Sequence, residues 1–172
     1  MDRAFFMTTD RIGFSRWRKD DLPLARLLWA DPAVSRWICA GGRFSDQEIS
    51  ARLEREIRNE EAFHMQYWPI FALSSGAFLG CCGLRPYCGE EYEMGFHLRP
   101  EFWGKGYASE AAAAVMGYGF SVLKAQALFA GHHPENLASS RVLGKLGFHY
   151  VGDRFYEPTG RYHPSYEFRQ GC

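Results

Sequence analysis

The stretch RPEFWGKGYASEA, residues 99–111, joins a strand-like run to a run of small helix-forming residues. Gly104 and Gly106 bracket Lys105 at the point where the strand pattern gives way to the helix pattern. A glycine turn that opens a helix leaves several backbone N–H groups unpaired, and with the helix dipole they attract an anion. The stretch predicts either a tight turn alone or a loop whose backbone a phosphate group approaches closely.

In the second case the backbone from Gly104 to Ala108 holds the anion, and Lys105 adds a cation. The loop is not a Walker A motif, because no GxxxxGK(S/T) is present. It also departs from the dinucleotide fingerprint GxGxxG, in which Ser109 would have to be glycine. A shorter anion loop than either is expected.

The segment before the loop, EYEMGFHL, residues 91–98, alternates between apolar and other residues. Side chains of successive strand residues point to opposite faces of a sheet. One face is therefore predicted to be buried, and the other to carry two carboxylates and an imidazole. The residues of the second face are Glu91, Glu93, Gly95 and His97.

Farther out, helices are predicted over 20–30, 45–59, 107–123 and 136–148, and a turn or short helix over 31–38. Ser45 and Glu48 form a capping box, Asn136 is a helix N-cap, and Gly147 is a helix stop. Strands are predicted over 11–17, 65–73, 77–87, 91–98, 126–132, 148–156 and 165–170. A two-residue hairpin at Ser75-Gly76 joins the second and third of these, and Pro69 indicates an edge or a bulge.

The element order is β-α-α-β-β-β-α-β-α-β-β, without repeat or linker, so residues 1–172 are predicted to form one mixed α/β domain. Hydrophobic residues make up 47% and aromatic residues 16% of the chain, which supports a packed core. Lys plus Arg, 20, balance Asp plus Glu, 20. Without a basic excess, a nucleic-acid partner is not expected.

Neither a signal peptide nor a membrane-spanning run is recognised, so no membrane association is expected. The five cysteines, with Cys81 and Cys82 adjacent, make a poor disulfide framework and indicate a reducing cytoplasm. No metal site is expected, because neither the Cys81-Cys82 pair nor His132-His133 has ligand spacing.

Four segments together carry a resemblance to a known family. EFWGKGYASEA, residues 101–111, resembles the acetyl-coenzyme A loop of the GNAT N-acetyltransferase superfamily, written (Q/R)-x-x-G-x-(G/A), in the branch of the RimJ/RimL ribosomal-protein acetyltransferases. NLASSRVLGKLGF, residues 136–148, RWRKDDLPLARLLWADPAVSRW, residues 16–37, and FLGCCGL, residues 78–84, are similar to other parts of the same family. The resemblance covers about residues 11–169 and implies a central, mostly antiparallel, twisted sheet flanked by helices.

The resemblance implies acetyl-coenzyme A as cosubstrate, with no metal. Its pyrophosphate would lie on the loop backbone of Trp103, Gly104, Lys105, Gly106, Tyr107 and Ala108. Its pantetheine arm would pair with the backbone of the preceding strand at Phe96, His97 and Leu98.

The implied reaction moves an acetyl group directly from the thioester to an amine. The N-x-x-S motif maps to Asn136, which would contact the cofactor arm, and Ser139, which would donate a proton or a hydrogen bond to the leaving sulfur unless water does so. Many relatives use a tyrosine seven residues after that asparagine, where this chain has Leu143. Glu93 and His97 are candidates for the general base, directly or through a water molecule.

Glu157 and His163 are outside candidates for the base, and in several relatives water alone serves. Two positions depart from the family pattern. Glu101 stands where the loop pattern has Gln or Arg, which removes a phosphate donor, and Gly144 stands where this branch commonly has Glu.

The acceptor is expected between the two N-terminal helices and the sheet, where six aromatic residues can line its site: Trp29, Trp37, Phe44, Trp68, Tyr87 and Tyr156. A protein or peptide α-amine and a small amine or amino acid remain open as acceptors, as do a monomer and a homodimer. A rival hypothesis is a non-catalytic acyl-coenzyme A-binding or sensing domain.

Overall fold

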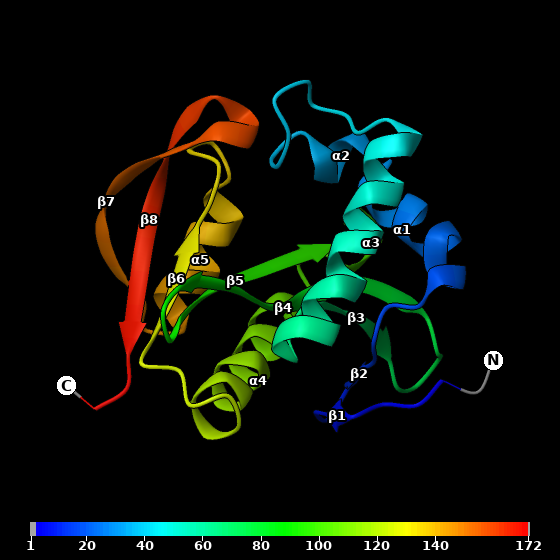
Figure 1. The fold of residues 1–172 in the computed structure, drawn as a ribbon, viewed down its shortest axis with the longest axis horizontal. Helices are drawn as coiled ribbons and strands as arrows, with labels where there is room; N and C mark the ends of the chain where they lie inside the picture. The colour runs from blue at the N-terminus through cyan, green and yellow to red at the C-terminus, as the bar shows by residue number, and fades with distance from the viewer. Residues whose placement is uncertain (1–2, 172) are drawn as a thin grey trace.

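The computed structural model describes residues 3–171 as one eight-stranded sheet with helices on both faces (Figure 1). Its strand order is β1-β2-β3-β4-β5-β6-β8-β7. The strands are β1 (Met7–Thr8), β2 (Ile12–Phe14), β3 (Tyr67–Ala72), β4 (Phe78–Cys88), β5 (Glu91–Leu98), β6 (Ala127–Gly131), β7 (His149–Tyr156) and β8 (Arg161–Arg169). The helices are α1 (Leu22–Trp29), α2 (Pro32–Ser35), α3 (Asp46–Phe63), α4 (Tyr107–Ser121) and α5 (Leu137–Lys145). The predicted mixed α/β, GNAT-like fold is confirmed.

All neighbouring strands are antiparallel except β5 and β6, which run parallel. Their pairing covers only Glu91–Glu93 against Ala127–Phe129. β5 continues to Leu98, so beyond Glu93 its edge toward β6 has no partner strand within residues 3–171. The sheet therefore splits at this point, and both strands lead into the split.

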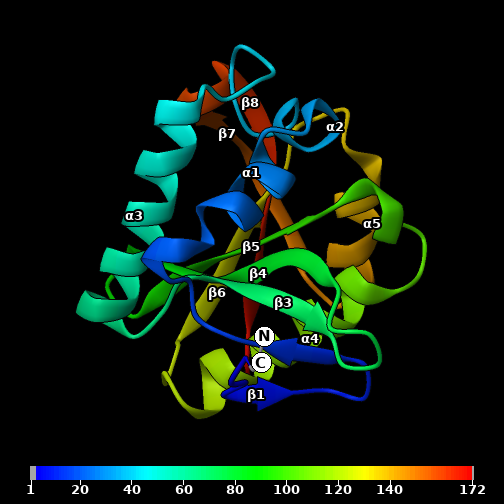
Figure 2. The same ribbon diagram turned by 90° about the vertical axis from the view of Figure 1, so that its right-hand side faces the viewer.

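Two apolar clusters fill the space between the sheet and the helices on its two faces, and the perpendicular ribbon views show these helices on either side of the sheet (Figures 1 and 2). Helices α4 and α5 cover one face, where Ala111, Ala112 and Val115 are fully buried. Helices α1, α2 and α3 cover the other. The small residues of α4 let it lie close to the sheet: a Cβ on Gly119 would come within 3.1 Å of Leu84.

Two of the predicted helix-end signals are confirmed, although α3 extends beyond its predicted end to Phe63. Ser45 accepts the N–H of Glu48, and the Glu48 carboxylate accepts the N–H of Ser45 at 2.7 Å, which completes the capping box. Gly147, at φ +85°, follows the end of α5, as predicted.

The N-terminal part of the sheet differs from the prediction. Strand β1 was missed, and β2 is shorter than 11–17 because the chain beyond Phe14 leaves the ladder toward α1. A second difference is the β3–β4 connection, which is longer than two residues. It runs over 73–77 and closes through the Ala72 N–H donating to the Ala77 carbonyl at 2.9 Å.

Pro69 is not on an edge strand, because β3 lies between β2 and β4. It is tolerated because pairing with β2 ends at Ile70, one residue away, so its missing N–H breaks no ladder bond there. The predicted bulge is present next to it, between Ile70 and Phe71.

Cys39, Cys81, Cys82 and Cys88 are free thiols, and Cys172 lies outside the described residues. Across residues 3–171, no helix combines the length and the apolar composition that crossing a membrane demands.

Candidate active site

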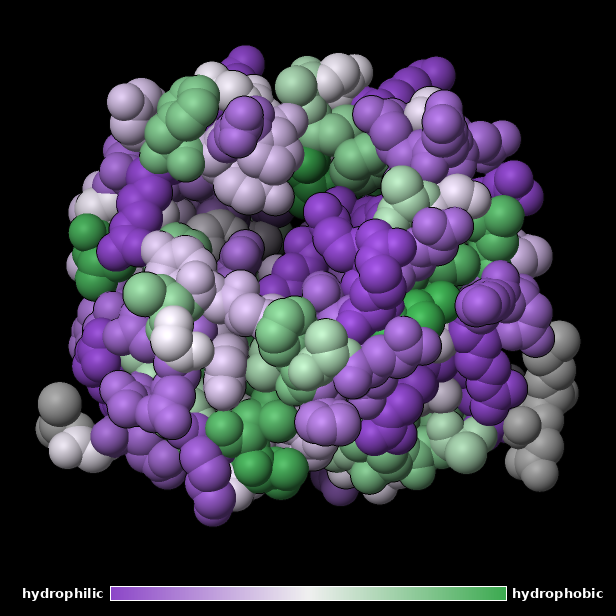
Figure 3. All heavy atoms as spheres, viewed as in Figure 1, coloured by the Kyte–Doolittle hydropathy of each residue, from purple (hydrophilic) through white to green (hydrophobic). Residues whose placement is uncertain are grey.

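The split between β5 and β6 opens into a cavity of about 740 Å³. The space-filling view shows the surface hollowed between the β7–β8 side and the α2–α3 side (Figure 3). Residues of β5, the loop before α4, α5, α2 and the β7–β8 hairpin line it, together with Arg52 from α3. One cavity thus reaches both the glycine loop and the helices expected to bound an acceptor.

The glycine loop has the backbone that an anion site requires. Gly104 and Gly106 have φ angles of +72° and +80°, a region that residues with a Cβ rarely adopt. Gly106 is the N-cap of α4 and no side chain caps this helix, so its first N–H groups remain free for a ligand. The loop residues present therefore fit a pyrophosphate group.

Arg11, a residue that the sequence did not single out, holds this loop from the opposite end of the chain. It forms an ion pair with Glu110 at 2.7 Å, donates to the Lys105 carbonyl at 3.0 Å, and lies 4.4 Å over the Tyr107 ring. No local signal marks Arg11, because its partners lie about a hundred residues away.

Three loop side chains point to protein groups. The Trp103 indole donates to the Leu98 carbonyl at 2.9 Å. Glu101 pairs with Arg99 at 2.7 Å. Lys105 is exposed, with its ammonium 5.6 Å from the centre of the Phe102 ring, and it does not line the cavity. Of Glu101, Trp103 and Lys105, only Trp103 lines the cavity.

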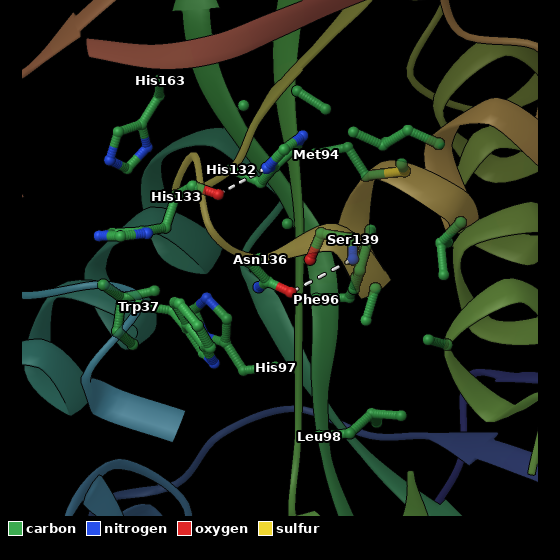
Figure 4. Close-up of a pocket in the computed structure, with 18 of the residues that line it drawn as sticks. Trp37, Met94, Phe96, His97, Leu98, His132, His133, Asn136, Ser139 and His163 are labelled. Carbon is green, nitrogen blue, oxygen red and sulfur yellow. Dashed lines mark hydrogen bonds between the residues drawn. The ribbon is translucent and has the colours of Figure 1, made fainter. Parts of the chain in front are cut away.

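Asn136 and Ser139 lie side by side in the cavity wall at the start of α5 (Figure 4). The Asn136 side-chain oxygen accepts the Ser139 N–H at 3.3 Å, which is the predicted N-cap. Ser139 is half-buried. Leu143, one turn farther on, is buried and also lines the cavity.

Glu93 and His97 are half-buried on one face of β5, while Met94 and Leu98 are buried on the other, as the alternation predicts. The Trp29 indole of α1 donates to Nδ1 of His97 at 3.3 Å. Burial lowers the pKa of His97 well below its usual value, and Arg52 and Arg85 add to the effect, so this imidazole is neutral near pH 7. Burial raises the pKa of Glu93, although Arg85 and Arg52 oppose the shift.

The two outside candidates for the base lie apart from each other. His163 lines the cavity (Figure 4). Its Nε2 lies 2.7 Å from the Thr159 hydroxyl. Burial lowers its pKa to about 4, with His133 and His132 contributing. Glu157 is exposed on the β7–β8 hairpin and does not line the cavity.

The six aromatic candidates divide evenly. Trp37, Tyr87 and Tyr156 line the cavity. Trp29 and Phe44 pack in the core under α1 and α3. Trp68 is on the opposite face of the sheet, with its ring 5.2 Å from that of Tyr118 of α4, so its assignment to the acceptor side is wrong.

A buried charged group at the cavity was missed from the sequence. It consists of Arg52 and Glu56 on α3, Arg85 on β4 and the Tyr67 phenol on β3. A signal existed: Arg52 and Glu56 stand three and seven residues after Ile49, on the helix stripe expected to be apolar. Charged residues on such a stripe indicate a paired or functional site.

In residues 3–171, no group of three His, Cys, Asp or Glu side chains is arranged to hold a metal ion. His132 and His133 instead bond to each other, through Nδ1 of His132 and the His133 carbonyl at 2.7 Å. Both line the cavity.

Comparison with known proteins agrees with this geometry. The model of the acetyltransferase (GNAT) domain family matches residues 11–149. An uncharacterized protein of Bacillus subtilis, YkkB, is 33% identical over 148 residues, which cover 84% of this chain and 85% of that protein. These matches span most of the predicted resemblance.

Solved structures share the fold. An acetyltransferase from Agrobacterium tumefaciens superposes with a TM-score of 0.82 at 22% identity, covering 99% of both chains. A RimL ribosomal-protein acetyltransferase in complex with coenzyme A gives 0.81 at 16% identity, covering 96% of this chain and 98% of that one. The chain therefore belongs to the GNAT family of acetyl-coenzyme A-dependent N-acetyltransferases.

Proposed function

We propose that this protein transfers an acetyl group from acetyl-coenzyme A directly to a primary amine that enters the cavity from the α2–α3 side. One observation supports this most strongly. The unpaired edge of β5 leads directly into the uncapped N-terminus of α4, and both border one cavity that also contains Ser139 and Glu93. A pantetheine arm needs such an edge, and a pyrophosphate needs such a helix end.

The cosubstrate would be held mainly by backbone groups. Phe96, His97 and Leu98 would pair with the pantetheine amides along the free edge of β5. The N–H groups of 103–108, with glycine at 104 and 106, would receive the pyrophosphate. Lys105 would contribute through its backbone in the conformation described here, because its side chain points away from the cavity.

The reaction balances as follows: an ammonium group and the thioester give an amide, a free thiol and one proton. The C–N bond forms as the C–S bond breaks, so the leaving sulfur takes the electron pair and one proton. The second proton leaves the amine before attack. The protein must therefore accept one proton on the amine side and supply one on the sulfur side.

Glu93 is the proposed proton acceptor, directly or through one water. Its raised pKa brings the carboxyl closer to the range in which a base works best near neutral pH. Ser139 is the proposed donor to the sulfur, and Asn136 would contact the cofactor arm while capping α5. His97 is less suited to the base role, because Nδ1 already accepts the Trp29 N–H and the imidazole is held neutral.

The melting temperature with saturating acetyl-coenzyme A, coenzyme A, ATP or NAD tests the cofactor site. A ligand at about a hundred times its Kd adds about 2.7 kcal/mol, or roughly 5–10 °C for a domain of this size. We expect a rise with the two coenzyme A species and none with NAD. If neither coenzyme A species raises the melting temperature, the proposed function is wrong.

Release of free thiol in the presence of amines then tests catalysis. Turnover with at least one amine is the expected result. Firm binding of acetyl-coenzyme A without turnover on any amine would instead identify an acyl-coenzyme A-binding or sensing domain.

A further inference from the structure

Two arginines lie in the wall of the cavity on the side away from the glycine loop, Arg52 from α3 and Arg85 from β4. Arg85 is satisfied. It forms an ion pair with Glu56, which is fully buried, and its guanidinium lies 3.8 Å from the centre of the Tyr67 ring. The charges of Arg85 and Glu56 therefore compensate each other.

Arg52 is different. Only 9% of its surface is exposed, yet within residues 3–171 its guanidinium has neither a carboxylate partner nor a hydrogen bond, and its buried Nε is unsatisfied. The rings of Trp29 and Phe44, at 4.9 and 5.3 Å, hold the side chain in place. Aromatic faces fix a guanidinium plane and leave its N–H groups free to receive a planar anion.

Two carboxylates lie near Arg52 without forming an ion pair with it: Glu56, and Glu93, whose pKa burial raises while the charge of Arg52 opposes the shift. Glu56 is committed to Arg85, and it also accepts the Tyr67 N–H at 2.8 Å. Burial lowers the pKa of Arg52 to about 10 and the like charge of Arg85 adds to this, so the residue remains charged at neutral pH. A buried, charged and unpaired side chain at a cavity wall requires a partner that enters with a ligand.

We propose that the acceptor carries an anionic group, a carboxylate, which binds the guanidinium of Arg52 while its amine lies at Glu93. This inference rests on the proposed function and narrows its substrate. The opposite charges of Arg52 and Glu93 line the same cavity, so together they complement a zwitterion. The acceptor class is then a free amino acid or a similar small amino carboxylate.

The same charges disfavour two other acceptor classes. A polyamine would bring a second cation toward Arg52 and Arg85. The α-amine of a protein chain is followed by a peptide bond instead of a carboxylate, so it would leave Arg52 unpaired. Either class would have to bury an uncompensated charge.

The test is thiol release measured on matched pairs of acceptors. Each free amino acid is compared with its carboxamide, which keeps the amine and side chain and removes only the negative charge. Spermidine and short peptides with amidated ends represent the other two classes. Because a charge-assisted hydrogen bond to a buried partner is lost, we expect kcat/KM to favour the best carboxylate over its amide by about 10- to 100-fold or more.

Variants assign the preference to Arg52. Arg52→Met, which retains the apolar stem, should reduce the preference to within about threefold while acetyl-coenzyme A still raises the melting temperature. Arg52→Lys should restore part of the preference, because it keeps the charge and loses the planar fork. Arg58→Met, on the exposed side of the same helix, is the control and should retain the full preference.

Equal or faster turnover of the amides, of spermidine or of the peptides by the unaltered protein would overturn the inference and leave the proposed function standing. A carboxylate preference that survives in Arg52→Met would also overturn it. Absence of turnover with every acceptor would overturn both, and the melting-temperature response to acetyl-coenzyme A would show whether the cofactor site is real.

Discussion

The hydroxyl of Ser139 is free to interact with a ligand, whereas that of the neighbouring Ser140 lies within reach of a protein group. Within the described chain the Ser139 hydroxyl makes no hydrogen bond, and the residue lines the cavity next to the N-cap Asn136. The Ser140 hydroxyl, in contrast, lies 3.4 Å from that of Tyr166. A free hydroxyl in a cavity wall is suited to a proton donor.

We therefore expect Ser139→Ala to lower kcat by about 10²-fold or more, as for loss of a general acid. Thiol release at saturating acetyl-coenzyme A measures it. Ser140→Ala, an identical change one residue away, should stay within a few-fold of the unaltered protein. An unchanged rate in Ser139→Ala would remove this residue from the mechanism.

The role proposed for Glu93 predicts how activity depends on pH. Its carboxyl must be ionised to accept a proton, so activity should fall as the pH is lowered through its pKa. Because burial raises that pKa, the fall should begin at a higher pH than for an ordinary carboxyl. Glu93→Gln should lower kcat/KM by about 10²–10⁴-fold and abolish this acidic limb.

A pH profile of kcat/KM from about pH 5 to 9 is the measurement. Glu90→Gln, at the turn before β5 and bonded to Gln126, is the control and should keep the profile of the unaltered protein. If the acidic limb persists in Glu93→Gln, the titrating group is elsewhere.

Individual residues were predictable only where their role is local. Asn136 and Gly106 act through the backbone next to them, so a short motif marks them. Arg11 and Arg52 act on groups distant in sequence, and only the folded chain shows what surrounds them. The roles proposed for Glu93 and Ser139 remain predictions.

At the scale of a helix, α4 contains a matched pair of glycines with opposite demands. Gly106, the N-cap, has φ +80°. Gly117 is an exposed glycine in the helix interior, and a Cβ there would meet nothing within 4 Å. The same substitution should therefore have opposite effects at the two positions.

Gly106→Ala should lower the melting temperature by several degrees, because a left-handed alanine costs about 1–2 kcal/mol, and should weaken coenzyme A binding. Gly117→Ala should raise the melting temperature by about 2–4 °C, for a gain of up to about 1 kcal/mol, with unchanged binding. Thermal unfolding and titration calorimetry measure both. Unaltered coenzyme A affinity in Gly106→Ala would contradict the proposed backbone cradle.

The element order was predictable because the signals that mark its helices and strands are local. Capping boxes, glycine stops and strand alternation are signals within a few residues, and they located α3, β5 and α5. Strand β1 is two residues long and, among the described strands, pairs with β2 alone, so no local pattern announces it. Likewise, the contact that Trp29 of α1 makes with His97 is not shown by the strand's own alternation.

For the whole molecule, the buried histidines predict sensitivity to acid. Burial lowers the pKa of His163 to about 4 from an ordinary 6.5, so between these values the unfolded chain binds a proton that the folded chain does not. The free energy of unfolding should therefore decrease as the pH falls from about 6.5 toward 4. The pKa of His97 and that of His133 are lowered in the same direction.

The melting temperature measured between pH 7 and 4.5 checks this. In His163→Gln the decrease should be smaller than in the unaltered protein, while the exposed His64→Gln should follow the unaltered curve. An identical acid dependence in all three proteins would show that His163 is not protonated on unfolding in this range.

The short junction between β5 and β6 should also affect local unfolding of the sheet. Strands β6, β7 and β8 reach the rest of the sheet only through Ala127–Phe129, whereas β4 and β5 pair along nearly their full length. In native-state hydrogen exchange the C-terminal strands should therefore open together as one cooperative unit, at lower free energy than β3–β5. An acetyl donor lying in the split would contact both halves, so its binding should slow amide exchange across the C-terminal unit as well as at the residues it touches.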